Sequence, residues 1–279
     1  MQQKLTVYFT TFFLIYFCFA CFSFVHAFSV EQSEGIDLAS QGMFKEARAE
    51  FNKAIKINRG DSLSKSALGI LDDFDSGKIK EECLLPLFKG LGLLARNLPA
   101  EAVEEFRLAE KVAPGYPKTH NILGMVYTIL GSFDEAEIQF KQAIELQPKY
   151  SEAYFNLGAF YQSQDKNAQA LEFYEKAAAL DPGSAETHMN IGYMYAEQGR
   201  YEKAVSHFQK VLGLDAYNAD AYYNLGMAYF MSDQYLKSRQ NFVKARKIFQ
   251  QRKDNEKVAS VDKYLDKFFE LEKKWKAMN

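Results

Sequence analysis

Residues 151–184 read SEAYFNLGAFYQSQDKNAQALEFYEKAAALDPGS. Apolar residues follow the spacing of one helix face from Tyr154 to Tyr161, and a polar run then interrupts that spacing. A second helical spacing runs from Ala170 to Leu180, where Asp-Pro-Gly ends it. Each half has about 13 residues, so neither helix would be stable alone and both must be stabilised by packing. The stretch therefore predicts two short helices that pack against each other.

The same pattern recurs every 34 residues in the second half of the chain. Four glycines mark it, and they are Gly124, Gly158, Gly192 and Gly226. A tyrosine follows each glycine after three residues, and an aromatic residue follows after sixteen. A fixed period with fixed residue types indicates a stack of identical helical hairpins, and such stacks usually bind other proteins.

At these residues the chain resembles the tetratricopeptide repeat family. In the stretch quoted above, the family's motif is matched by Tyr154, Leu157, Gly158, Tyr161, Ala170, Tyr174, Ala177 and Pro182. The motif recurs in register four times, which makes it specific. The resemblance implies an all-α fold, a right-handed superhelical solenoid of helix-turn-helix repeats. Ala216 and Gln250 replace the motif proline, so the array departs from the pattern toward its C-terminal end.

The repeat register divides the chain into segments. We expect full repeats at 117–150, 151–184, 185–218 and 219–252, a degenerate repeat at 83–116 and a repeat-like unit at 28–61. The segment 62–82 is expected to be a half-repeat or an extra helix, with a helix at about 62–74 and Pro86 beginning the next one. Residues 253–279 predict an amphipathic helix that caps the solenoid, or alternatively docks a partner or a membrane.

The N-terminal segment 1–27 has the features of a signal peptide. It carries Lys4 and then a long apolar run, and Val25-His26-Ala27 is a small-residue cleavage site that would leave Phe28 as the first residue. The apolar run is also long enough to remain as a signal anchor in the membrane, and both alternatives stay open. In both cases we expect the repeats to lie beyond the cytoplasmic membrane, in a periplasmic or envelope setting.

Composition and motifs argue against several classes of function. The formal net charge is −2 and no basic cluster stands out, so nucleic-acid binding has no electrostatic support. The sequence has no zinc-protease, phosphate-loop or haem motif, so we expect no enzyme activity, no cofactor and no metal. His120 and His188 occupy the repeat position of Tyr154 and Tyr222, and we expect both to have packing roles.

In tetratricopeptide proteins the first helix of each hairpin lines a concave groove, and the resemblance carries this over to the present chain. The sixth residue of three successive repeats is Asn156, Asn190 or Asn224. Such a ladder of amides could hold the backbone of an extended peptide, or asparagine could simply be common at this position of the family. The groove positions around the ladder are Phe155, Ala159, Met189, Tyr193, Tyr223, Met227, Phe230 and Met231, a surface suited to apolar contacts.

The family's chaperone-binding members hold a terminal carboxylate with Lys and Arg in the groove. The corresponding positions here are Glu152, Phe155, Glu186, Met189, Asp220 and Tyr223, so such a ligand is not expected. We expect a non-catalytic scaffold that binds a protein or peptide partner with apolar side chains and some positive charge. The alternatives are an assembly factor or adaptor of an envelope machine, such as a pilus or secretion system, that acts through self-association as a homo-oligomer, and a non-catalytic subunit of an enzyme complex.

Overall fold

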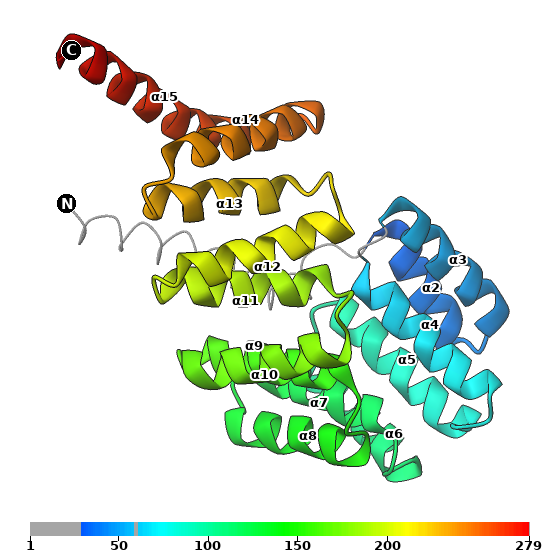
Figure 1. Ribbon diagram of the computed structural model, residues 1–279. Coiled ribbons are helices and arrows are strands. Elements are labelled where there is room, and N and C mark those ends of the chain that lie inside the picture. The colour runs from blue at the N-terminus through cyan, green and yellow to red at the C-terminus, as the bar shows by residue number, and fades with distance from the viewer. Residues whose placement is uncertain (1–28, 59–60, 279) are drawn as a thin grey trace. The chain divides into compact units, whose positions relative to one another are not determined.

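A computed structural model describes residues 29–58 and 61–278 of the chain, and the predicted signal segment 1–27 lies outside these residues. Every regular element in the described residues is a helix, which confirms the all-α prediction (Figure 1). Contacts divide the chain into two compact units, one ending at Lys166 and the other beginning at Asn167. Each unit is therefore described by itself.

The two units are built from helices of 11 to 24 residues. The first unit contains α2 (Val30–Ser40), α3 (Phe44–Ile57), α4 (Ser62–Asp75), α5 (Glu81–Ala95), α6 (Pro99–Val112), α7 (Pro117–Leu130), α8 (Phe133–Leu146) and α9 (Ser151–Ser163). The second unit contains α10 (Asn167–Leu180), α11 (Ala185–Glu197), α12 (Tyr201–Leu214), α13 (Ala219–Met231), α14 (Tyr235–Gln251) and α15 (Asn255–Met278). Extensive contacts join α2 to α3, α5 to α6, α7 to α8, α11 to α12 and α13 to α14, so these pairs are the hairpins of the fold.

A glycine on the first helix of each of these hairpins meets a phenylalanine on the second. The pairs are Gly35 with Phe51, Gly90 with Phe106, Gly124 with Phe140, Gly192 with Phe208, and Gly226 with Phe242. A Cβ atom added to any of these glycines would lie 2.5–2.8 Å from a ring carbon of its phenylalanine, closer than real Cβ atoms approach. The phenylalanine rings are fully buried. The 34-residue period therefore arises because each hairpin packs one ring against a helix with no side chain at that point.

The turn inside each hairpin also repeats. A residue with positive φ occurs every 34 positions, at Asn97, Gly131, Asp165, Gly199 and Asp233, with φ between 58° and 76°. Glycine adopts this left-handed conformation without steric cost, and Asn and Asp tolerate it better than most residues. In the hairpins α5–α6, α7–α8, α11–α12 and α13–α14 this residue reverses the chain after the first helix, and the second helix packs back against the first.

Helix α4 has the repeat glycine but no second helix of its own. Its glycine is Gly69, and the chain passes from α4 through a short turn directly into α5. A Cβ atom at Gly69 would lie 2.9 Å from Nζ of Lys118, which belongs to α7. A lysine from another hairpin therefore lies over Gly69, at the place where the other repeat glycines receive a phenylalanine ring.

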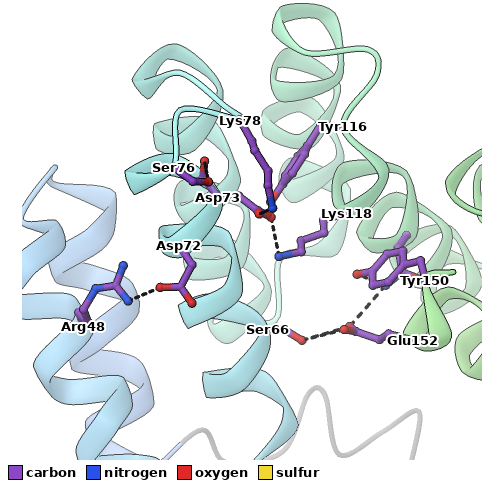
Figure 2. Close-up of polar contacts among 11 residues, drawn as sticks. Arg48, Ser66, Asp72, Asp73, Ser76, Lys78, Tyr116, Lys118, Tyr150 and Glu152 are labelled. Atoms are coloured by element: carbon purple, nitrogen blue, oxygen red, sulfur yellow. Dashed lines mark hydrogen bonds and ion pairs between the residues drawn. The ribbon is translucent and has the colours of Figure 1, made fainter. Parts of the chain in front are cut away.

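Polar side chains hold α4 against α7 and α9 (Figure 2). The buried carboxylate of Asp73 pairs with Lys118 Nζ and Lys78 Nζ, both at 2.7 Å, and accepts a hydrogen bond from the Tyr116 hydroxyl at 2.9 Å. The Ser66 hydroxyl lies 3.1 Å from both carboxylate oxygens of Glu152. Segments 43 and 86 residues apart in sequence are joined by these contacts.

The start of α5 differs from the prediction. The sequence predicts that Pro86 begins this helix, but α5 begins five residues earlier, at Glu81, and Pro86 lies buried inside it. Proline has no backbone N–H, so Pro86 cannot make the helical hydrogen bond to the carbonyl of Glu82. Glu81 and Glu82 favour the earlier start, because carboxylates interact favourably with the positive end of the helix dipole. The apolar face after Pro86 then packs in the core of the first unit, and this burial offsets the lost hydrogen bond.

The last helix covers one side of the final hairpin. The Tyr264 ring of α15 stacks on Phe242 with 5.1 Å between centroids, and the Phe268 ring meets Phe230 at 5.7 Å. Lys257 at the start of α15 pairs with Asp220 of α13 at 2.8 Å. These contacts bury Phe268 and Val261, so α15 shields apolar side chains of α13 and α14 from solvent.

Candidate functional site

The predicted groove residues are divided between the two units. Phe155, Asn156 and Ala159 lie on α9 of the first unit, and the remaining members lie on α11 and α13 of the second. These members are Met189, Asn190 and Tyr193 on α11, and Tyr223, Asn224, Met227, Phe230 and Met231 on α13. The second unit therefore brings together most of the predicted partner-binding residues.

The Asn224 side chain connects α13 to α11. Its Nδ2 atom donates to the Tyr193 hydroxyl at 2.8 Å and lies 3.6 Å from the sulfur of Met189. The Tyr193 ring in turn packs edge-on against Phe208 at 5.7 Å. These contacts hold the amide in one orientation, with its donor group directed at the chain itself.

The Asn156 side chain makes the equivalent contacts in the first unit. Its Nδ2 atom donates to Oδ1 of Asn121 at 3.1 Å and lies 3.5 Å from the sulfur of Met125. In both cases the acceptors are 35 and 31 residues earlier in the sequence, on the first helix of the preceding hairpin. Two of the three ladder asparagines therefore use their donor groups between neighbouring helices, which the sequence did not predict.

Asn190 differs from the other two. Its side chain is half-buried on α11, and within the part of the chain that the structure describes no hydrogen bond is recorded for its amide. Its neighbours on the same helix, Met189 and Tyr193, are also half-buried. We call these three residues, together with Asn224, the Asn190 surface.

The α13 members of the predicted groove are largely covered by the chain itself. Met227 is 6% exposed. The Tyr223 ring packs edge-on against Phe242 and Tyr264. Burial, followed by the neighbouring Tyr264, raises the pKa of Tyr223. Phe230 contacts Tyr264 and Phe268, so α15 occupies much of the surface that the sequence assigned to a partner.

Acidic groove positions also have internal partners. Glu152 accepts the Ser66 hydroxyl, and burial raises its pKa although the hydrogen bond from Ser66 acts in the opposite direction. Asp220 is paired with Lys257. Glu186 lies exposed on α11 of the second unit. Within the second unit, the α11 positions Met189, Asn190 and Tyr193 are half-buried beside the exposed Glu186.

A cavity of about 640 Å³ lies on another side of the second unit, among α10, α11 and α12. Its walls are mainly apolar, with small side chains at Ala178, Ala179 and Gly213. His188 and His207 also line it, and their Nδ1 atoms are 3.2 Å apart. Burial and then the nearby Lys210 lower the pKa of both rings, that of His207 to about 4. Both histidines are therefore neutral at pH 7.

Neither a larger ligand set nor a membrane span occurs in the described residues. Across 29–58 and 61–278, no group of three or more His, Cys, Asp and Glu side chains is arranged to hold a metal ion. Within these ranges, no helix combines the length and apolarity that crossing a membrane requires.

Family models match the central and C-terminal repeats. Two models described as tetratricopeptide repeats match residues 115–183 and 173–206, and one described as a TPR repeat matches residues 192–233. Together these matches cover residues 115–233, which include the hairpins α7–α8 and α11–α12. Among curated protein sequences, no significant match was found.

Solved structures with similar folds share little sequence with this chain. MamA from Desulfovibrio magneticus RS-1 is 21% identical, with a TM-score of 0.55 over 62% of this chain and 97% of its own. PilF from Pseudomonas aeruginosa is 18% identical, with a TM-score of 0.55 over 71% of this chain and 98% of its own. YrrB, described as a TPR protein with an unusual peptide-binding site, is 22% identical, with a TM-score of 0.50 over 71% and 91%. At these identities the similarity establishes the fold alone.

Proposed function

Because the chain belongs to the tetratricopeptide repeat family, whose stacked hairpins are protein-interaction scaffolds, we propose that it is a non-catalytic scaffold that binds a protein partner at the Asn190 surface. The observation that carries this proposal is the Asn190 amide, for which no hydrogen bond is recorded among the described residues. Asn156 and Asn224, at the same repeat position, both donate to the preceding hairpin.

The chemistry of the Asn190 surface suits an extended peptide with apolar side chains. The Asn190 amide offers a donor and an acceptor to a peptide backbone, whatever the peptide's sequence. Met189 and the Tyr193 ring supply adaptable apolar contacts beside it. YrrB, which has a similar fold, has a peptide-binding site, and this supports a peptide as the kind of partner.

The test is cross-linking in intact cells followed by purification of the chain and quantification of the proteins captured with it. Asn190→Ala removes one amide hydrogen bond to the partner, worth about 0.5–1.5 kcal/mol, so capture should fall about two- to tenfold. Asn241→Ala is the matched control, because Asn241 lies on α14 and its amide donates to the Lys237 carbonyl of the same helix.

The proposal is contradicted if capture is the same in Asn190→Ala and the wild type while circular dichroism shows both folded. An equal fall in Asn241→Ala would also contradict it. Gel filtration of the same samples separates the alternative of self-association, in which the captured protein is a second copy of the chain and the elution volume depends on concentration.

We further propose that the repeats function beyond the cytoplasmic membrane. The support is the sequence of residues 1–27, which lies outside the described residues. N-terminal sequencing of the protein isolated from cell fractions is the measurement. A cleaved signal peptide should give Phe28 as the first residue in an exported fraction, and a signal anchor should give the intact N-terminus in the membrane fraction. An intact N-terminus in the cytoplasm would contradict export.

A further inference from the structure

The hydrogen bonds of the two histidines in the α10–α12 cavity fix where their protons lie. Nε2 of His188 is 3.2 Å from the carbonyl oxygen of Pro182, which can only accept a hydrogen bond. Nε2 of His188 therefore carries the proton, and in a neutral ring Nδ1 then has a free lone pair. Nδ1 of His207, at 3.2 Å, must be the donor to this lone pair.

This arrangement has the features of a pair of metal ligands. Histidine ligands usually donate the other ring N–H to a backbone carbonyl or a carboxylate, as His188 donates to Pro182, and this fixes the ring orientation. Imidazole nitrogens bind transition metals at about 2.0–2.1 Å, so two nitrogens on one ion, at tetrahedral or square geometry, are about 2.9–3.4 Å apart. The observed separation of 3.2 Å lies in this range.

We propose that His188 and His207 bind a divalent transition-metal ion, of the class of Zn²⁺, Ni²⁺ or Cu²⁺, through their Nδ1 atoms. On binding, the proton of His207 moves from Nδ1 to Nε2, so both rings remain neutral and no net proton is released. Water completes the coordination, since no third protein ligand lies within reach among the described residues. The site departs from the sequence-based expectation of no metal, because that expectation considered each histidine alone.

The surroundings of the site set its strength. The cavity leaves space beside both rings, and Glu175 lines the same cavity. Lys210 also lines the cavity. Its ammonium group lowers the pKa of both histidines because it repels a second positive charge, and it disfavours a metal cation for the same reason. The site is accordingly expected to be weaker than a closed structural zinc site with four protein ligands.

Two repeats earlier, the chain contains an equivalent arrangement that has only one histidine. His120 is 68 residues before His188, and its Nε2 atom lies 2.8 Å from the Pro114 carbonyl, as His188 faces Pro182. The position equivalent to His207 is Gln139, whose Oε1 atom lies 2.8 Å from Nδ1 of His120. Glutamine at this position keeps a polar side chain against the first imidazole but removes the second imidazole.

The test is isothermal titration of the full chain, prepared without a histidine tag, with Zn²⁺ and separately with Ni²⁺ at pH 7.5. The wild type is expected to bind one ion at this site. His207→Gln, which copies Gln139, should weaken that binding at least tenfold while circular dichroism shows an unchanged fold. His188→Tyr, which copies Tyr154 and Tyr222, should have the same effect.

Two further variants test the geometry by gain of binding. Gln139→His should create a second site with His120 and raise the stoichiometry by one ion. Lys210→Gln should tighten binding at the first site several-fold, because it removes a nearby positive charge. The proposal is overturned if the wild type binds no more metal than His207→Gln, or if all variants bind the same amount, which would mean adventitious binding by other side chains.

Discussion

Gly192→Ala should destabilise the second unit by about 3 kcal/mol. The added Cβ atom would lie 2.5 Å from Cε1 and 2.8 Å from Cδ1 of Phe208. Phe208 is 1% exposed, so its ring cannot rotate away into solvent, and overpacking of a core of this kind typically costs about 1–3 kcal/mol or more. The measurement is the urea concentration at the unfolding midpoint, followed by circular dichroism.

The chain provides a matched control for this substitution. Gly213 is also a helical glycine of the second unit, and a Cβ atom there would meet nothing within 4 Å. Gly213→Ala should therefore be neutral or stabilising by up to about 1 kcal/mol, because alanine favours the helix. In the double variant Gly192→Ala/Phe208→Leu, the smaller leucine should partly restore the stability lost in Gly192→Ala. If the destabilisation of the double variant is instead the sum of those of the two single variants, the Phe208 ring is not what excludes the alanine methyl group.

Asp73→Ala should destabilise the first unit by about 3 kcal/mol. The substitution leaves the Lys118 ammonium group and the Tyr116 hydroxyl, both partly or wholly buried, without their acceptor. Removal of one partner from a buried ion pair typically costs about 3–5 kcal/mol, and the partial exposure of Lys118 places this case at the lower end. Asp72→Ala is the control, since Asp72 is 66% exposed in its pair with Arg48 and such pairs contribute at most about 1 kcal/mol.

The same carboxylate predicts how the stability depends on pH. Burial by itself raises the pKa of Asp73, but hydrogen bonds from Lys118, Lys78 and Tyr116 outweigh it and hold the pKa below its usual value. A lowered pKa in the folded state means that Asp73 stabilises the protein fully above the unfolded value of about 3.9. This stabilisation is lost as the pH falls through the folded pKa. The stability difference between wild type and Asp73→Asn should therefore shrink below about pH 4, and a difference that does not depend on pH would contradict this.

The repeats could be predicted from sequence because their signal is local and repeated. Gly192 and Phe208 are sixteen residues apart, and the same spacing recurs at Gly124 with Phe140 and at Gly226 with Phe242. A pattern that recurs in register identifies both helices of a hairpin and the face on which they meet. The all-α fold and the family resemblance were predicted correctly for this reason.

The position of α4 could not be predicted in the same way. Ser66, Asp73 and Lys118 are polar residues without a repeat pattern, and in a sequence they look like solvent-exposed residues of amphipathic helices. Their contacts join segments far apart in the chain, and no periodicity reports such pairs. Pro86 was misleading for a related reason, since a buried proline inside a helix is tolerated only because tertiary packing offsets the lost hydrogen bond.

The predicted groove was assigned from repeat position alone, which says which face a residue occupies but not what covers it. Tyr223 and Phe230 occupy groove positions, yet α15 packs against both. The internal hydrogen bond of Asn224 could have been predicted from the sequence, because Tyr193, 31 residues earlier, supplies a hydroxyl acceptor. The pairing of His188 with His207 could have been predicted as well, from the nineteen-residue offset shared with His120 and Gln139.

Contacts such as Ser66 with Glu152, 86 residues apart, give the first unit a folding behaviour that its repeats alone would not have. Stacked hairpins have mostly local contacts, so they fold fast and can gain or lose terminal repeats almost independently. The links from α4 to α7 and α9 close a long loop of chain, which raises the contact order and joins distant hairpins into one cooperative block. Deletion of the chain up to residue 80 would therefore weaken the hairpins that remain, because Lys118 would lose Asp73 and Glu152 would lose Ser66.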